Sequence, residues 1–425
     1  MLDLKFIRKN PDLVKEAVKN KGEDVDIDKI LELDEKRRII IKDLDEERNR
    51  LNVISKEISK LIKEGRKPEV EKEKAKEISE KVKDLEKKLR EIEEELKSLL
   101  LKVPNIPHST VPVGDSSKNK IIRTWGKKPE FSFKPLDHIK IAQNLDIIDF
   151  ERAAKICGSN FVLFKGWGAR LERALYNFML DLHIRKHKYT EVFPPFLVNR
   201  KSMIGTGQLP KLEEDMYRLK DDDYFLIPTA EVPVTNIHRE EILDESQLPI
   251  YYVSYTACFR REAGSYGKET KGLVRVHQFD KVELVKIVKP QDSYEELERL
   301  VNDAEEVLKL LGLHYRVVLL ASQELSFAAS KCYDLECWAP GLQRWLEVSS
   351  CSNFEDFQAR RMGMRLRTKD KKLTYPHTLN GSGLALARLV ICILETYQNK
   401  DGSVTVPQVL RPYLDNIERI EPSKF

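Results

Sequence analysis

A heptad pattern in the first quarter of this chain constrains its fold more than any other feature. Ten positions between 30 and 61 recur with alternating gaps of three and four, and only Arg37 and Glu47 among them are not Ile or Leu. The pattern stops at a Gly-Arg-Lys-Pro sequence (65–68) and resumes as an apolar stripe over 75–99. Two heptad helices around a tight break predict an antiparallel coiled-coil hairpin, with each helix roughly 50 Å long.

The arm suggests how the rest of the chain is divided. Three prolines and a glycine over 102–114 indicate a linker. We therefore expect three parts: an N-terminal domain over 1–101 with its arm at about 30–100, a linker over 102–118, and a second domain over 119–425. Taken alone, such an arm is more often a solvated spacer or a dimerisation element than a binding arm.

Beyond the linker, strand-like runs such as 251–255 mix with helical runs such as 384–397. They do not repeat as strand–helix–strand units, so an α+β body built on an antiparallel sheet is favoured over a doubly wound parallel sheet. No glycine-rich phosphate loop of the G-x-x-x-x-G-K-[ST] type occurs.

Composition excludes several classes of function. A net charge of +4 is too small to indicate nucleic-acid binding by itself. Cys332 and Cys337 are five apart with no histidine nearby, and no C-x-x-C pair occurs, so we predict no zinc site. Scattered thiols favour a cytoplasmic location. The start lacks the apolar run of a signal peptide, and no stretch is apolar enough to span a membrane.

Two neighbouring segments, 256–262 and 275–283, carry side chains suited to a nucleotide. We interpret them as two strands joined by a hairpin loop over 263–274. Side-chain alternation then groups two guanidinium groups, one aromatic ring and two carboxylates: Arg260, Glu262, Arg275, Phe279 and Glu283. Guanidinium groups suit phosphate oxygens, a ring suits a base and carboxylates suit amino groups. An amphipathic hairpin with a solvated salt-bridge face explains this segment equally well.

Seven segments occur in the order and at the spacing of one family. They are 189–195, 205–210, 226–231, the pair 256–262 and 275–283, 345–353, 356–361 and 378–388. On these residues nearly the whole chain resembles the seryl-tRNA synthetases, which are class II aminoacyl-tRNA synthetases. The Phe-Arg-x-Glu pattern at 259–262 is similar to motif 2 of that class, the segment ending in Arg388 to motif 3, and 189–195 to motif 1. Lys188 stands where motif 1 usually has a glycine.

The resemblance implies a serine–tRNA ligase. L-Serine would attack the α-phosphate of ATP to give seryl-adenylate and pyrophosphate, and serine would then pass to the 3′-terminal adenosine of tRNA(Ser), with tRNA(Sec) as an alternative acceptor. The attacking carboxylate is already ionised, so the first step needs positioning and charge stabilisation rather than a base. We therefore interpret His277 as a structural residue. The resemblance also implies a homodimer.

The resemblance assigns roles to the nucleotide-binding side chains. Three arginines, Arg260, Arg275 and Arg388, would be the catalytic residues. Arg260 would hold the α-phosphate, while the other two grip the far end of the triphosphate. Phe279 would stack on adenine and Glu262 would accept its amino group. The remaining ATP-binding candidates are Arg261, Val276, Glu347, Val348, Ser349 and Ser350.

The same resemblance implies a magnesium site and a serine pocket. Glu347 would bind Mg²⁺, with Ser350 assisting. Strict alternation puts these two side chains on opposite faces of a strand, so either the strand bulges or Ser350 acts differently. The serine-binding candidates are Thr229, Ala230, Glu231, Arg260, Glu283, Asn380 and Ser382. Singly, Thr229 as a helix cap or Asn380 as a turn residue is an equally good explanation.

The arm would grip the long variable arm of the serine tRNA through phosphate and shape contacts. The basic candidates near its tip are Lys60, Lys63, Arg66, Lys67 and Lys72.

Three alternatives remain. A ligase that loads an amino acid onto a carrier protein would lack the long arm. A catalytically inactive synthetase-like scaffold would be expected to lose the ATP-binding arginines, which are present here. A synthetase for another small amino acid, such as threonine, would be expected to show zinc-ligand Cys and His in its pocket.

Overall fold

The computed structural model describes residues 1–263 and 271–422, in two compact units. The first unit is Leu2–Pro104, and the second is Asn105–Phe425 together with Met1. Within the described residues, no helix combines the length and the apolar character that crossing a membrane requires.

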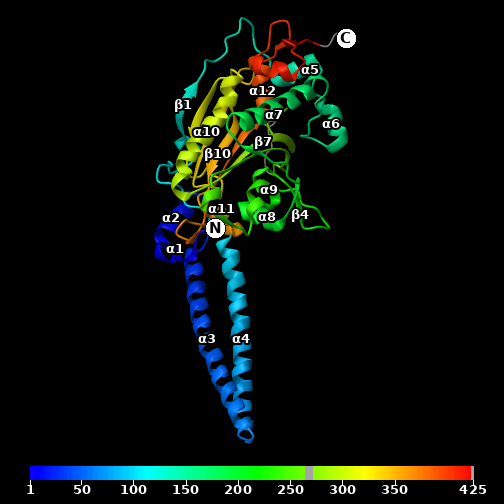
Figure 1. The fold of residues 1–425 in the computed structure, drawn as a ribbon. Coiled ribbons are helices and arrows are strands. Elements are labelled where there is room, and N and C mark those ends of the chain that lie inside the picture. The colour runs from blue at the N-terminus through cyan, green and yellow to red at the C-terminus, as the bar shows by residue number, and fades with distance from the viewer. Residues whose placement is uncertain (264–270, 423–425) are drawn as a thin grey trace. The chain divides into compact units, whose positions relative to one another are not determined.

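The first unit is helical and contains the predicted hairpin. Its elements are α1 (Leu4–Lys9), α2 (Pro11–Asn20), α3 (Ile27–Lys63) and α4 (Glu69–Leu100). The two long helices contain 37 and 32 residues and lie side by side (Figure 1). Every position of the predicted stripe is buried or partly buried between them. The predicted hairpin of two long helices is therefore confirmed.

The two polar residues that interrupt the stripe form ion pairs between the helices. Arg37 Nε lies 2.9 Å from Glu93 Oε1, and the buried Glu47 carboxylate lies 2.5 Å from Lys81 Nζ. Lys81 lowers the pKa of Glu47. A buried charge at a single core position favours one register over the alternatives, so these pairs fix how α3 and α4 align.

The second unit is built on an eight-stranded sheet. Its strand order is β1-β8-β9-β10-β13-β7-β6-β2, and in the described residues every neighbouring pair is antiparallel except β6 with β2. The strands of this sheet are β1 (Lys120–Trp125), β2 (Thr190–Glu191), β6 (Ile250–Phe259), β7 (Gln278–Val288), β8 (Tyr315–Leu319), β9 (Lys331–Ala339), β10 (Arg344–Asn353) and β13 (His377–Ala385). The α+β body on an antiparallel sheet is confirmed.

Shorter strands and several helices complete this unit. The strands are β3 (Leu197–Asn199), β4 (Tyr224–Leu226), β5 (Ile242–Asp244), β11 (Arg365–Arg367), β12 (Leu373–Thr374), β14 (Val404–Thr405) and β15 (Arg419–Ile420). The α-helices are α5 (His138–Leu145), α6 (Phe150–Cys157), α7 (Trp167–Arg185), α8 (Arg200–Thr206), α9 (Glu231–Thr235), α10 (Ser293–Leu310), α11 (Phe357–Met362) and α12 (Leu386–Thr396).

The two faces of the large sheet have different environments. One face packs on α7, α10 and α12 and forms the main apolar core, to which Val282 and Leu284 of β7 contribute (Figure 1). Successive side chains of a strand point to opposite faces, so Phe279, Lys281 and Glu283 lie on the other face of the strand, although the Phe279 ring still packs against the edge of that core. These three residues line a cavity of about 500 Å³.

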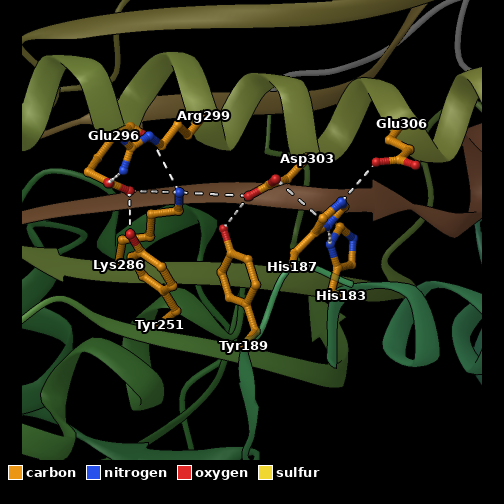
Figure 2. A network of polar contacts seen from close by, with 9 residues as sticks. All are labelled: His183, His187, Tyr189, Tyr251, Lys286, Glu296, Arg299, Asp303 and Glu306. Atoms are coloured by element: carbon orange, nitrogen blue, oxygen red, sulfur yellow. Dashed lines mark hydrogen bonds and ion pairs between the residues drawn. The ribbon is translucent and has the colours of Figure 1, made fainter. Parts of the chain in front are cut away.

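A buried network of polar side chains joins the sheet to α10 on the core side (Figure 2). Lys286 Nζ on β7 lies 3.0 Å from Glu296 Oε2 and 3.7 Å from Asp303 Oδ2, both on α10. The Tyr251 hydroxyl donates to Glu296, and the Tyr189 hydroxyl donates to Asp303, each over 2.8 Å. Lys286 is only 1% exposed, so its charge depends on these acceptors.

Replacing Lys286 with methionine should destabilise the second unit by about 3 kcal/mol, because the buried Glu296 carboxylate loses its buried cation and keeps only the exposed Arg299, 2.6 Å away. All four tryptophans, at positions 125, 167, 338 and 345, lie in this unit, so urea unfolding followed by tryptophan fluorescence measures its stability. Lys289→Met is the matched control. Its ion pair with Glu245 is partly exposed, and the expected loss is within about 1 kcal/mol. Equal losses in the two variants would contradict a special role for the buried network.

Candidate active site

A cavity of about 500 Å³ in the second unit lies on the sheet face opposite the helices α7 and α10. Its lining contains thirteen of the predicted site residues: Thr229, Glu231, Arg260, Glu262, Arg275, Val276, Phe279, Glu283, Glu347, Ser350, Asn380, Ser382 and Arg388. They come from β7, β10, β13, the starts of α9 and α12, the segment before α9 and the segment between β6 and β7. Segments far apart in the sequence therefore meet at one place.

The predicted hairpin strands are shorter than expected. β6 ends at Phe259 and β7 begins at Gln278, so Arg260, Glu262 and Arg275 lie outside the strands. The prediction that strand alternation groups these side chains is therefore wrong, although the cavity does bring them together. Of the predicted loop over 263–274, the part 264–270 lies outside the described residues.

Backbone geometry directs Glu262 toward the cavity. Its φ of 51° is left-handed, a conformation that non-glycine residues adopt rarely and at some energetic cost. The turn brings the Glu262 carboxylate 3.0 Å from Arg275 Nη1. Strain of this kind persists only where the surroundings enforce it, which is typical of a functional site.

Arg260 reaches across the start of β7. Its guanidinium carbon lies 5.2 Å from the centre of the Phe279 ring, and its Nε donates to the Pro228 carbonyl over 3.3 Å. His277 contacts the Arg260 carbonyl oxygen through Nδ1 at 3.0 Å. This contact holds the backbone at Arg260 and agrees with a structural role for His277.

A bulge in β10 explains how the side chains of Glu347 and Ser350 reach the same face of the strand. The pairing with β9 shifts between Glu347 and Ser349, so one extra residue, Val348, lies between them. Both Glu347 and Ser350 consequently line the cavity. Glu347 also lies 3.1 Å from Arg388 Nη1, and its backbone carbonyl accepts from the same guanidinium over 2.9 Å.

The deep end of the cavity holds a buried polar cluster. Lys281 forms an ion pair with Glu283 and donates to the Thr229 hydroxyl over 2.9 Å. The Thr229 hydroxyl in turn donates to Glu283 over 3.3 Å, and Asn380 Nδ2 donates to the other oxygen of Glu283 over 3.0 Å. A hydroxyl, an amide and a carboxylate therefore meet in one small buried space.

Glu231 lies in the same cluster with a shifted pKa. Gln358 Nε2 donates to its Oε1 atom over 2.6 Å. Burial, and next the charge of Glu283, raise the pKa of Glu231 to about 7. The carboxyl of Glu231 therefore changes its charge close to neutral pH.

Four predicted site residues do not line the cavity: Ala230, Arg261, Val348 and Ser349. Arg261 borders a different groove with Glu213 and Tyr217. Ser349 is buried, and its hydroxyl donates to the Ser382 carbonyl over 2.6 Å. Ser349 therefore joins β10 to β13 without lining the cavity itself.

Polar residues at the site that the sequence analysis did not single out include Lys281, Asp334 and Gln358. Lys281 lies two residues from both Phe279 and Glu283, so alternation alone places it on their face. Asp334 pairs with Ser350 across β9 and β10. Burial, then the charge of Glu347, raise the pKa of Asp334 well above its usual range. No local pattern indicates Gln358, because its contact to Glu231 spans 127 residues of sequence.

Among residues 1–263 and 271–422, no three or more His, Cys, Asp or Glu side chains are grouped closely enough to hold a metal ion by themselves.

Known proteins resemble this chain over its whole length. Residues 1–107 match the family described as the seryl-tRNA synthetase N-terminal domain, and residues 214–397 match the tRNA synthetase class II core domain (G, H, P, S and T). A serine–tRNA ligase from Caldicellulosiruptor saccharolyticus is 61% identical over 417 residues, which cover 97% of this chain and 99% of the relative.

Solved structures agree with the sequence comparison. The seryl-tRNA synthetase from Pyrococcus horikoshii, crystallised with ATP, superposes with a TM-score of 0.93 at 38% identity and covers 100% of both chains. The cytoplasmic serine–tRNA ligase from Naegleria fowleri, in complex with AMP, superposes with a TM-score of 0.87 at 34% identity and covers 100% of this chain and 99% of that one.

Proposed function

Because the chain belongs to the seryl-tRNA synthetase family, whose members join serine to tRNA, we propose that its large cavity forms seryl-adenylate from ATP and L-serine. One observation carries the proposal: three arginines, an aromatic ring and a buried carboxylate cluster line a single cavity. The serine carboxylate attacks the α-phosphate, pyrophosphate leaves, and the 3′-terminal adenosine of tRNA(Ser) then takes the seryl group. tRNA(Sec) is the alternative acceptor.

The nucleotide occupies the end of the cavity near Phe279. Its adenine stacks on the Phe279 ring and donates to Glu262, while Arg260 contacts the α-phosphate, where negative charge develops. Arg275 and Arg388 bind the far end of the triphosphate. Arg275 lies beside Glu262 and Arg388 lies beside Glu347. A phosphate oxygen of ATP therefore replaces the carboxylate as the partner of each arginine, or binds the arginine together with it.

The residues outside the lining have supporting roles. Val348 supplies the bulge, Ser349 joins β10 to β13, and Ala230 positions its neighbours Thr229 and Glu231. Arg261 points to another groove, so we assign it no contact with ATP.

The oxygen groups at the edge of the cavity suit magnesium. Glu347 and Ser350 line the cavity together, and Asp334 lies across the strand pair from Ser350. Burial, and next the charge of Glu347, raise the pKa of Asp334, and a cation bound beside these carboxyls would favour its ionised form. Bound Mg²⁺ supplies charge neutralisation for the phosphates.

Omitting magnesium while titrating ATP should weaken ATP binding by the wild-type chain. In Glu347→Gln, omitting magnesium should no longer change the affinity for ATP.

Serine binds in the deep polar cluster. Its ammonium group pairs with Glu231 and Glu283, its carboxylate faces Arg260, and its hydroxyl contacts the group formed by Thr229, Asn380 and Ser382. Alanine would leave these buried polar groups unpaired and is therefore rejected strongly. Threonine is rejected by its extra methyl group, which is worth only about 1–3 kcal/mol.

The KM for serine should fall as pH rises through about 7, because only ionised Glu231 attracts the serine ammonium group. The pKa of Glu231 in the folded protein is raised to about 7. The protonated form of Glu231 therefore dominates below this pH, and the ionised form dominates above it. Glu231→Gln should raise the KM about tenfold or more and remove this pH dependence. The exposed Glu214→Gln is the control and should keep the wild-type profile. A wild-type profile in Glu231→Gln would show that another group titrates.

The helical arm binds the tRNA. Lys60, Lys63, Arg66, Lys67 and Lys72 lie at its tip, and the side chains of Lys60 and Arg66 are 77% and 70% exposed. Lys60 and Lys63 border a shallow groove on α3 together with Asn52, Ser55 and Ser59. Ammonium groups beside hydroxyl and amide groups suit phosphate and ribose oxygens.

The chain also forms a homodimer through the region of motif 1. β2 is the edge strand of the large sheet, and Phe193, just beyond it, is 75% exposed. Analytical ultracentrifugation of the full chain tests this; a monomer at micromolar concentration would contradict it.

A cytoplasmic location fits six cysteines that are all free thiols, and cell fractionation checks it.

The decisive experiment is pyrophosphate exchange into ATP with serine, threonine, alanine, glycine and cysteine supplied separately. Exchange with serine alone is expected. Exchange with another amino acid would overturn the pocket assignment. No exchange in folded protein with magnesium would favour a catalytically inactive scaffold, and exchange without tRNA charging would favour transfer to a carrier protein.

A further inference from the structure

A second cavity, of about 230 Å³, adjoins the active-site cavity. Four residues line both cavities: Leu273, Val276, Phe279 and Ala387. The remaining walls are mostly apolar and come from α6 and the segment before α7, including Ile156, Phe161, Val162 and Phe164. None of the roles assigned above uses this space.

One buried carboxyl group lies in the wall of this cavity. Glu172 on α7 is only 7% exposed, and its Oε2 atom has no hydrogen-bond partner within residues 1–263 and 271–422. A second carboxyl, that of Asp280, also lines the cavity and accepts from the Tyr255 hydroxyl over 3.0 Å. No lysine or arginine in the described chain lines this cavity.

A buried acceptor without a donor is unfavourable, since burial removes the water that would otherwise satisfy it. Burial and the nearby Asp280 raise the pKa of Glu172 well above its usual range. This shift favours the protonated, uncharged form of Glu172. A cation placed between the two carboxyls would supply the missing donor and favour the ionised form.

We propose that this cavity binds a small organic cation: a primary amine or amidine carried on a compact apolar ring. The charged nitrogen pairs with Glu172 and Asp280, and the ring lies among Phe161, Val162 and Phe164. Aromatic walls suit both parts of such a ligand. The volume is below the range of about 300–1,000 Å³ typical of drug-sized ligands, so the ligand is a single ring rather than a nucleotide.

The shared wall connects this site to the active site. A ligand that packs against Phe279 from the second cavity restricts the ring on which adenine stacks, so ligand and ATP should change each other's affinity by the same factor. This coupling depends on the proposed role of Phe279 in ATP binding. Binding of the cation itself does not.

Calorimetric titration of the full chain with benzylamine tests the proposal, with benzyl alcohol as the uncharged comparison. Saturable binding of benzylamine is expected, with benzyl alcohol at least about tenfold weaker because it lacks the charge. Glu172→Gln should weaken benzylamine binding about tenfold or more, because glutamine cannot ionise. Glu151 on α6 is exposed and lies outside the cavity lining, so Glu151→Gln should leave the affinity for benzylamine unchanged.

Val162→Phe places a larger side chain in the cavity wall while keeping the Glu172 carboxyl, and it should also abolish binding. Serine-dependent pyrophosphate exchange, measured on the same variants, shows separately that each is folded and active. The proposal is overturned if benzylamine fails to bind the wild-type chain, or if Glu172→Gln and Val162→Phe bind it as tightly as wild type. Binding without any effect on ATP affinity would overturn the coupling and retain the site.

Discussion

Replacing Arg260 with alanine should lower serine-dependent pyrophosphate exchange by about two to three orders of magnitude, because it removes a preorganised donor from the position where charge develops in the transition state. The loss should appear mainly in kcat, since adenine keeps Phe279 and Glu262 and the serine ammonium group keeps Glu231 and Glu283, and only the serine carboxylate loses its partner. The fold should survive, because Arg260 lies beyond the end of β6 and contributes one long hydrogen bond, to Pro228.

Arg261→Ala is the matched control for Arg260→Ala. The two arginines are neighbours in the sequence, but only Arg260 lines the active-site cavity. Arg261→Ala should therefore exchange pyrophosphate at nearly the wild-type rate. Near-normal exchange in Arg260→Ala would refute its role, and equal damage in both variants would mean that the turn after β6 presents both side chains to ATP.

The elements that could be predicted from the sequence are those fixed by local periodicity. The arm could be predicted because the apolar residues of α3 and α4 recur every three or four positions. This is the spacing at which side chains of one helix meet the other helix. Even its exceptions are informative, since Arg37 and Glu47 interrupt the stripe where ion pairs join the helices. The extra helix α1 was not anticipated, because six residues carry too little periodicity.

The candidate site was harder to predict because it depends on departures from regular structure. Alternation correctly groups Phe279 with Glu283, and it should also have identified Lys281 between them. It cannot reveal that β6 ends at Phe259, nor that Glu262 adopts a left-handed φ. The bulge at Val348, which brings Glu347 and Ser350 to one face, leaves no mark in the sequence either.

One departure from the family pattern now has a structural reason. Lys188, where motif 1 usually has glycine, adopts a φ of 64°. Glycine reaches this left-handed conformation without a steric penalty, whereas lysine does not. The ammonium group of Lys188 donates to the Arg185 carbonyl over 2.8 Å, which offsets part of that cost at the end of α7. The turn itself is therefore retained despite the substitution.

Deleting residues 31–100 should leave serine activation intact and lower the rate of tRNA charging by at least about a hundredfold, since contacts to several phosphates are lost together. The apolar core beside the active site is built entirely from residues of the second unit, so adenylate formation does not need the arm. Pyrophosphate exchange measures the first step, and charging of tRNA(Ser) transcripts measures the second.

Charge reversal separates the role of the arm's tip from the effect of shortening the chain. Lys60, Lys63 and Lys67 changed together to glutamate should weaken charging strongly and reduce its salt dependence, because each lost phosphate contact removes about 0.7–0.9 from the slope of log affinity against log salt. The same reversal at Lys36, Lys42 and Lys97, exposed residues far from the tip in sequence, should have a smaller effect. Charging at the full rate by the deleted chain would show that the arm does not bind the tRNA. Loss of pyrophosphate exchange in that chain would instead show that the second unit needs the arm to function.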